Sequence, residues 1–171
     1  MTTKWIGALL VIAGCGGFGF SLAAAHRREV RELQGLLRSL EFMQWELTYR
    51  LTPLPELCAQ AGREAGGVLM KVFSDLSGEL NRQISPDVPS CMQVSLGRYR
   101  SALTPRGRKL LFQLGRSLGR FDLAGQLKSL KALQRACQDA LVSLERDKDV
   151  RMRNYQTLGL CAGAALAIIF A

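Results

Sequence analysis

Two uncharged, apolar segments at the ends of the chain limit the possible folds more than any other feature. The first runs from Trp5 to Ala25 and the second from Asn154 to Ala171. As an α-helix the first segment would be about 31 Å long, enough to cross the hydrocarbon core of a bilayer. The second is just long enough for a span or a deep insertion. We therefore expect membrane helices at residues 1–25 and 154–171, on either side of a domain at residues 26–153.

Two other interpretations of the ends stay open. Ala23–Ala25 resembles the cleavage site of a signal peptide, which would make this an exported helical protein. Arg27 and Arg28 follow directly, where positive charge resists export, so we favour a retained anchor. The C-terminal segment could instead be a buried core helix. Basic residues next to both segments favour a cytoplasmic location for the central domain.

The central domain has the residue pattern of an all-α protein. On residues 26–51, apolar side chains recur at steps of three and four, which is typical of one face of a helix. Prolines and glycines interrupt the pattern at 52–55, 66–67 and 86–89. Thr104 and Asp122 are suitable N-cap residues for the last two helices. The prediction is a six-helix bundle, with helices at 26–51, 55–65, 68–83, 89–102, 105–119 and from 122 into the C-terminal segment.

Positive charge gathers in one region of this domain. The net charge is +9, and from Arg98 to Arg135 only Asp122 is acidic. Such an excess suggests an acidic partner, which could be anionic lipid, nucleic acid or a protein surface. Tyr99 and Phe112 lie among the bases, so a membrane-anchored adaptor for nucleic acid is the alternative function. The candidate partner-binding residues, called the charge field below, are Arg98, Arg100, Arg106, Arg108, Lys109, Arg116, Arg120, Lys128 and Lys131.

The sequence offers no pattern for catalysis, a metal or a cofactor. The single histidine, His26, cannot form a histidine-based triad or a multi-histidine metal site. The glycines of residues 14–19 lie within an apolar segment and lack the P-loop lysine. The 5 cysteines include no CxxC pair. We expect a protein that is not an enzyme and needs no cofactor.

Three segments together resemble the stage III sporulation protein AB family. They are the opening Trp5–Leu10, the Thr-Pro-Leu-x-Glu motif at 52–56, and the pattern LG-x-x-LG-x-x-D-x-x-x-Q at 114–126. From the residues themselves we expect the first motif to form a turn, the two glycines to allow close helix approach, and the aspartate to cap the last helix. The motif residues are Thr52, Pro53, Leu54, Glu56, Leu114, Gly115, Leu118, Gly119, Asp122 and Gln126.

The resemblance implies a role in endospore formation. It implies a non-enzymatic platform in the membrane of the mother cell that faces the forespore, with a soluble domain similar to those of type II secretion platform proteins. The implied partners are other subunits of the stage III A complex, including its cytoplasmic ATPase.

Overall fold

The described part of the chain forms six α-helices and no strand. The computed structural model describes the backbone of residues 2–50, 52–82, 87–119 and 122–170, and the side chains of 24–50, 52–82, 87–119 and 122–147. The helices are α1 (Thr2–Tyr49), α2 (Leu54–Ala65), α3 (Gly67–Arg82), α4 (Val88–Arg98), α5 (Pro105–Ser117) and α6 (Leu123–Phe170). The predicted all-α, six-helix fold is confirmed in these ranges.

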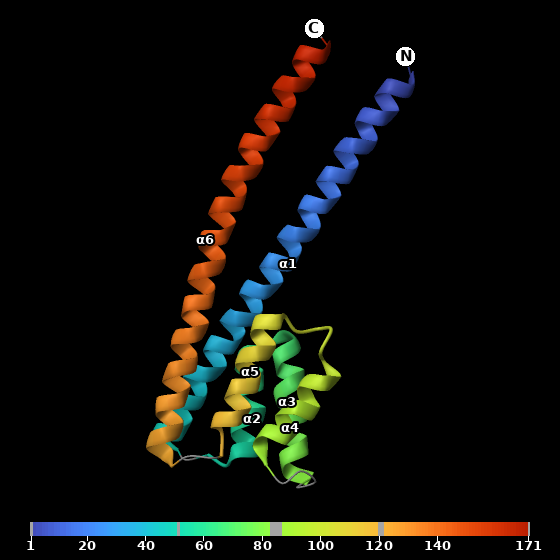
Figure 1. The fold of residues 1–171 in the computed structure, drawn as a ribbon. Coiled ribbons are helices and arrows are strands. Elements are labelled where there is room, and N and C mark those ends of the chain that lie inside the picture. The colour runs from blue at the N-terminus through green and yellow to red at the C-terminus, as the bar shows by residue number, and fades with distance from the viewer. Residues whose placement is uncertain (1, 51, 83–86, 120–121, 171) are drawn as a thin grey trace.

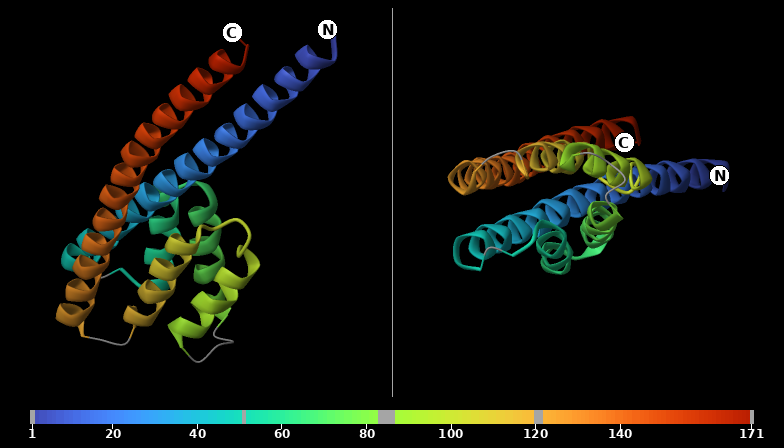
Figure 2. Two further views of the ribbon diagram at one scale, coloured as in Figure 1. Left: turned by 45° about the horizontal axis from the view of Figure 1, so that its top comes forward. Right: turned by 90° about the horizontal axis from the view of Figure 1, so that it is seen from below.

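Successive helices run in alternating directions, and the two longest lie side by side (Figure 1). α1 and α6 contain 48 residues each and extend past the four short helices toward the same end of the molecule, where both termini lie. α2 and α3 lie on the side of α1 that faces away from α6 (Figure 2). We call the end of the bundle nearer the two termini proximal and the opposite end distal.

Prolines and glycines define the helix ends in the first half of the bundle. α1 ends at Tyr49, before Pro53, and Pro55 lies in the first turn of α2, where a missing N–H costs nothing. Gly66 ends α2 with φ of 70°, and its N–H donates to the Gly62 carbonyl at 3.0 Å. A glycine takes this left-handed conformation without steric cost, so α2 and α3 can reverse direction over a single residue.

The fourth helix is shorter than predicted. It ends at Arg98 instead of continuing to Ala102. After Arg98 the chain turns, and the N–H groups of Ala102 and Leu103 both donate to the Tyr99 carbonyl, at 2.9 and 3.1 Å. Thr104 is extended, with ψ of 154°, because the following proline disfavours helical geometry in the residue before it.

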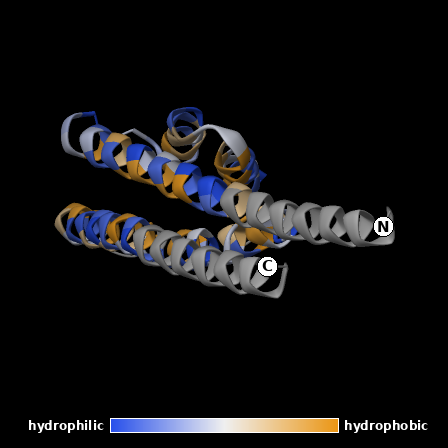
Figure 3. Cartoon of the chain, turned by 90° about the horizontal axis from the view of Figure 1, so that it is seen from above, coloured by the Kyte–Doolittle hydropathy of each residue, from blue (hydrophilic) through white to orange (hydrophobic). Residues whose placement is uncertain are grey.

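One hydrophobic core joins all six helices. On α1, Leu33, Leu40 and Leu47 are buried as the periodicity predicts, and Leu37 packs at the edge of the core. On α6, Leu130, Cys137 and Leu144 are buried. Apolar and polar residues alternate around the described parts of both long helices, as expected for amphipathic elements (Figure 3).

The predicted membrane helices fall almost wholly on residues whose side chains the structure does not describe. Of the two segments, only Ala24 and Ala25 have side chains that the structure describes. Among the residues with described side chains, no helix is long and apolar enough to span a bilayer.

Candidate functional site

The charge field separates into a proximal and a distal group. The proximal group follows α4 and begins α5, and consists of Arg100, Arg106, Arg108 and Lys109. The distal group ends α5 and begins α6, and consists of Arg116, Lys128 and Lys131 (Figure 1). Arg120 lies outside the described residues. The nine candidates therefore do not form one continuous surface.

Two members of the charge field form ion pairs within the bundle. Arg98 donates to Glu79 at 2.8 Å and to Asp75 at 3.3 Å, and so connects α4 to α3. The Glu79 side chain is buried, so this pair is part of the packing. Arg106 lies 3.7 Å from a carboxylate oxygen of Glu29 on α1. We therefore assign Arg98 and Arg106 structural contacts.

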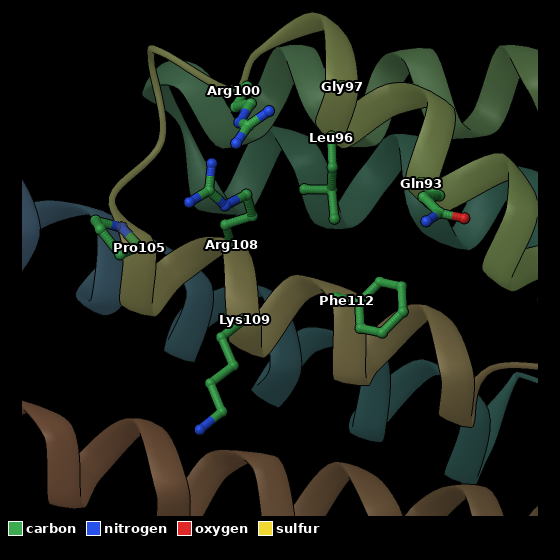
Figure 4. A pocket seen from close by; sticks show the side chains of 8 residues that line it. All are labelled: Gln93, Leu96, Gly97, Arg100, Pro105, Arg108, Lys109 and Phe112. Carbon is green, nitrogen blue, oxygen red and sulfur yellow. The ribbon is translucent and has the colours of Figure 1, made fainter.

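A shallow groove between α4 and α5 is lined by three of the basic residues of the charge field. Its volume is about 470 Å³. Arg100 and Arg108 point toward one another across one end, and Lys109 extends away from them (Figure 4). Leu96 and Phe112 lie farther along the groove. The residues that line it are Gln93, Leu96, Gly97, Arg100, Pro105, Arg108, Lys109 and Phe112, none of which is acidic.

A carboxylate from α1 caps the helix that carries this groove. The Thr104 N–H donates to Glu32 Oε2 at 3.0 Å, and the Thr104 hydroxyl donates to Oε1 at 3.1 Å. The same hydroxyl accepts from the Gly107 N–H at 3.1 Å, so the predicted N-cap is confirmed. In a capping box the third helical residue is usually Glu or Gln. Here that residue is Gly107, and a Cβ on it would collide with the Glu32 carboxylate, 2.8 Å from Cδ.

Burial makes Glu32 less acidic than an ordinary glutamate. Its side chain is 6% exposed, and the loss of hydration raises its pKa above the usual 4.5. The hydrogen bonds from Thr104 and the charge of Arg28 oppose this shift. Arg28 also donates to the Ala102 carbonyl. Residues 28–32 of α1 thus hold the α4–α5 turn and the start of α5 at a fixed height along α1.

The first motif lies where α1 turns into α2. The Thr52 hydroxyl donates to Glu46 Oε2 at 2.5 Å, and Glu46 is 2% exposed. Pro53 is the N-cap of α2, with φ of −55°, and Leu54 packs against the core. Glu56 lies in the first turn, where a carboxylate suits the positive helix end.

The leucines and the first glycine of the second motif lie in the bundle interior. Leu114 and Leu118 are buried in the core. A Cβ on Gly115 would lie 2.6 Å from Cβ of Met92, so α4 approaches α5 at the position of this glycine.

The remaining residues of the second motif lie around the turn into α6. Gly119 has φ of 74° and so serves the chain reversal after α5. A Cβ on it would also lie 3.0 Å from Val88 Cγ2 of α4, in keeping with the expected close helix approach. Asp122 Oδ1 accepts from the Gly125 N–H at 3.2 Å and so caps α6. The Asp122 carbonyl accepts from the Gln126 N–H at 2.9 Å, and the Gln126 side chain is half-buried.

Sequence reasoning missed an aromatic cluster at the distal end of α1. Trp45 is 49% exposed and Tyr49 is 72% exposed, with ring centroids 5.7 Å apart. The Arg50 guanidinium lies 5.3 Å from the centroid of the Trp45 ring. The two aromatic residues are four apart and lie off the apolar face of the helix, and this offset was the available signal.

Three cysteines of the described region have buried thiols. Burial raises the pKa of Cys58 to about 12 and that of Cys137 to about 11, and Cys91 is also buried. The side chains of Cys15 and Cys161 lie outside the described residues. Within the described ranges no group of three or more His, Cys, Asp or Glu residues could hold a metal ion.

Comparison with known proteins gives one consistent result. Residues 4–171 match the family described as "Stage III sporulation protein AB". The chain is 23% identical to "Stage III sporulation protein AB" of Bacillus subtilis (strain 168) over 168 residues, which is 97% of this chain and 98% of that protein. A solved structure of "Stage III sporulation protein AB (SpoIIIAB)" is similar with a TM-score of 0.64 and 22% identity, over 72% of this chain and 98% of that one, which supports the fold.

Proposed function

Because this chain belongs to the stage III sporulation protein AB family, we propose that it serves sporulation as a non-enzymatic membrane platform. In this proposal residues 1–25 and 154–171 are membrane helices, and residues 26–153 form a cytoplasmic domain. The platform lies in the mother-cell membrane that faces the forespore, within a secretion-like channel complex of stage III A subunits.

The arrangement of the two long helices is the observation that carries this proposal. α1 and α6 leave the bundle at its proximal end and run side by side, so their apolar ends can enter the same membrane (Figure 1). In an up-and-down bundle with an even number of helices, the first and last elements must leave at one end. The fold therefore suits a domain held by two adjacent anchors.

The charges beside the apolar segments support a cytoplasmic domain. Arg27, Arg28 and Arg31 follow the first segment, and Arg151 and Arg153 precede the second. Loops rich in Lys and Arg stay on the cytoplasmic side of a membrane. Both termini would then lie on the opposite side.

The distal end of the bundle is the proposed contact for the cytoplasmic ATPase of the complex. It lies farthest from the anchors, where a soluble partner has free access. Exposed Trp45, Tyr49 and Arg50 are there, and these residue types dominate the energetics of protein interfaces. Arg116, Lys128 and Lys131 add positive charge that would attract an acidic surface.

Co-purification of the ATPase with charge-reversal variants of the full chain tests this contact. Changing Arg116, Lys128 and Lys131 together to glutamate should abolish ATPase recovery at physiological salt. The matched control changes Arg100, Arg108 and Lys109 to glutamate and so alters the charge equally at the proximal end. Recovery equal to wild type with the distal variant, or equal losses with both, would contradict the distal contact.

A further inference from the structure

The proximal end of the bundle carries far more positive charge than the distal end. Residues 26–32 and 99–109, which meet there, contain seven basic and two acidic side chains. The distal stretches 41–56 and 113–131 contain five basic and four acidic side chains. We call the seven proximal bases the proximal collar: Arg27, Arg28, Arg31, Arg100, Arg106, Arg108 and Lys109.

The collar lies close to the end of the first apolar segment. The contacts of Arg28 with Ala102, Glu29 with Arg106 and Glu32 with Thr104 fix the α4–α5 turn beside residues 28–32. These positions follow Ala25 by three to seven residues along one continuous helix, a distance of about 5–10 Å at the α-helical rise. That distance is within about one Debye length, so salt would not fully screen the attraction between the collar and an anionic membrane surface at Ala25.

The two long helices reach their apolar segments at different heights. Cys137 on α6 donates to the Leu33 carbonyl on α1, so these residues lie at one level. From Leu33 to Ala25 the axial distance is about 12 Å, whereas from Cys137 to Asn154 it is about 25 Å. Both segments can meet the same membrane surface only if the helix pair tilts, with the α1 side nearer the bilayer.

This tilt brings the collar toward the lipid. α5 contacts both α1 and α6, and the view from below shows α4 and α5 in one layer with α6, whereas α2 and α3 lie on the other side of α1 (Figure 2). Because the contacts to residues 28–32 hold the turn beside α1, a membrane surface that lies nearer α1 also lies near Arg100 and Arg108. The two guanidinium groups face one another across the open groove, with no acidic residue lining it (Figure 4). Arginine groups in this arrangement suit a phosphate ester.

We propose that the proximal collar binds the headgroups of anionic phospholipids, with Arg100 and Arg108 holding the phosphate, so that the bundle rests on the membrane surface. This inference rests on the membrane anchoring proposed above. An acidic segment of a protein has the matching charge, but the height of the collar favours lipid. The part of the charge field left for a soluble protein is then the distal group.

Fluorescence quenching in bilayer discs tests the inference with the full chain. The proximal reporter is Ser101→Trp with Trp5→Phe and Trp45→Phe, and the distal reporter is native Trp45 with Trp5→Phe alone. The quenchers are phosphatidylcholine and phosphatidylglycerol, each with a nitroxide near the headgroup. We expect quenching at position 101 but not at 45, and roughly fivefold enrichment of the anionic lipid, as one basic residue at a charged surface gives.

Charge variants identify the groups responsible. Arg100→Glu with Arg108→Glu should remove the preference for phosphatidylglycerol at position 101, whereas the matched pair Lys128→Glu with Lys131→Glu should leave it unchanged. Equal quenching by the two lipids in the unaltered collar, or a preference that survives the Arg100 and Arg108 changes, would overturn the inference and leave the groove to an acidic protein segment. Extraction of the chain from native membranes by alkaline carbonate would instead refute the anchoring itself.

Discussion

Replacing Gly107 with alanine should destabilise the wild-type protein and stabilise a variant that already lacks Glu32. The Cβ of alanine would take the place of the Glu32 carboxylate. The carboxylate would have to leave, and both hydrogen bonds from Thr104 would be lost. Without that carboxylate, the methyl group meets the Thr104 hydroxyl oxygen, at 3.1 Å, and the greater helix propensity of alanine remains.

Gly107→Ala should change the free energy of unfolding in opposite directions in the wild-type and Glu32→Ala proteins. Hydrogen bonds to a charged group contribute about 1.5–3 kcal/mol each, but Glu32 also loses hydration, so we take about 2 kcal/mol as the net cost of displacing it. Alanine in place of glycine gains up to about 1 kcal/mol within a helix. Gly107→Ala should therefore cost about 1 kcal/mol in the wild type and gain about 1 kcal/mol in Glu32→Ala, a coupling of about 2 kcal/mol.

Thermal unfolding of the full chain in bilayer discs, followed by circular dichroism, measures this coupling. For a chain of this size each kcal/mol shifts Tm by about 2–4 °C. The matched control is Gly78→Ala on α3, because a Cβ there has no neighbour within 4 Å. That change should raise Tm equally in both backgrounds. If Gly107→Ala also shifted Tm equally in both, Glu32 would not occupy the position assigned to it.

Two further predictions concern stability. Because the pKa of Glu32 is raised above 4.5 in the folded state, the native protein holds this proton more tightly. The contribution is fully present below the unfolded pKa and is lost as pH rises through the folded pKa. Wild-type Tm should thus fall relative to Glu32→Gln as the pH rises above 4.5; a constant difference would contradict this. Gly115→Ala should cost about 1–3 kcal/mol by forcing α5 away from Met92, whereas Gly97→Ala, which meets open space on α4, should not lower Tm in the same denaturation assay.

Local signals were sufficient to predict the helices. The steps of three and four on α1, the prolines around residue 53 and the glycines at 66–67 all act within a few residues of their positions. The caps at Thr104 and Asp122 were found for the same reason, because an N-cap bonds to a backbone N–H in the next turn. The end of α4 was missed because residues 99–102 could continue a helix and only the approach to Pro105 prevents it.

Contacts between distant residues account for what the sequence did not reveal. Glu32 and Thr104 are 72 residues apart, so nothing local shows that a glutamate on α1 completes the cap of α5. The partners of Arg98 and Arg106 lie on α3 and α1, and their ion pairs remove them from a field that looked continuous in sequence. The division into proximal and distal groups depends on helix direction, which only the folded bundle specifies.

The sidedness of the central domain tests the membrane-platform account most directly. Trypsin would be added to intact, cell-wall-stripped cells that produce the full chain, and fragments of residues 26–153 would be followed with an antibody against the domain. The account predicts that the domain survives in intact cells and is digested only after lysis. Digestion in intact cells would place the domain outside the cytoplasm, exclude contact with a cytoplasmic ATPase, and favour an exported protein.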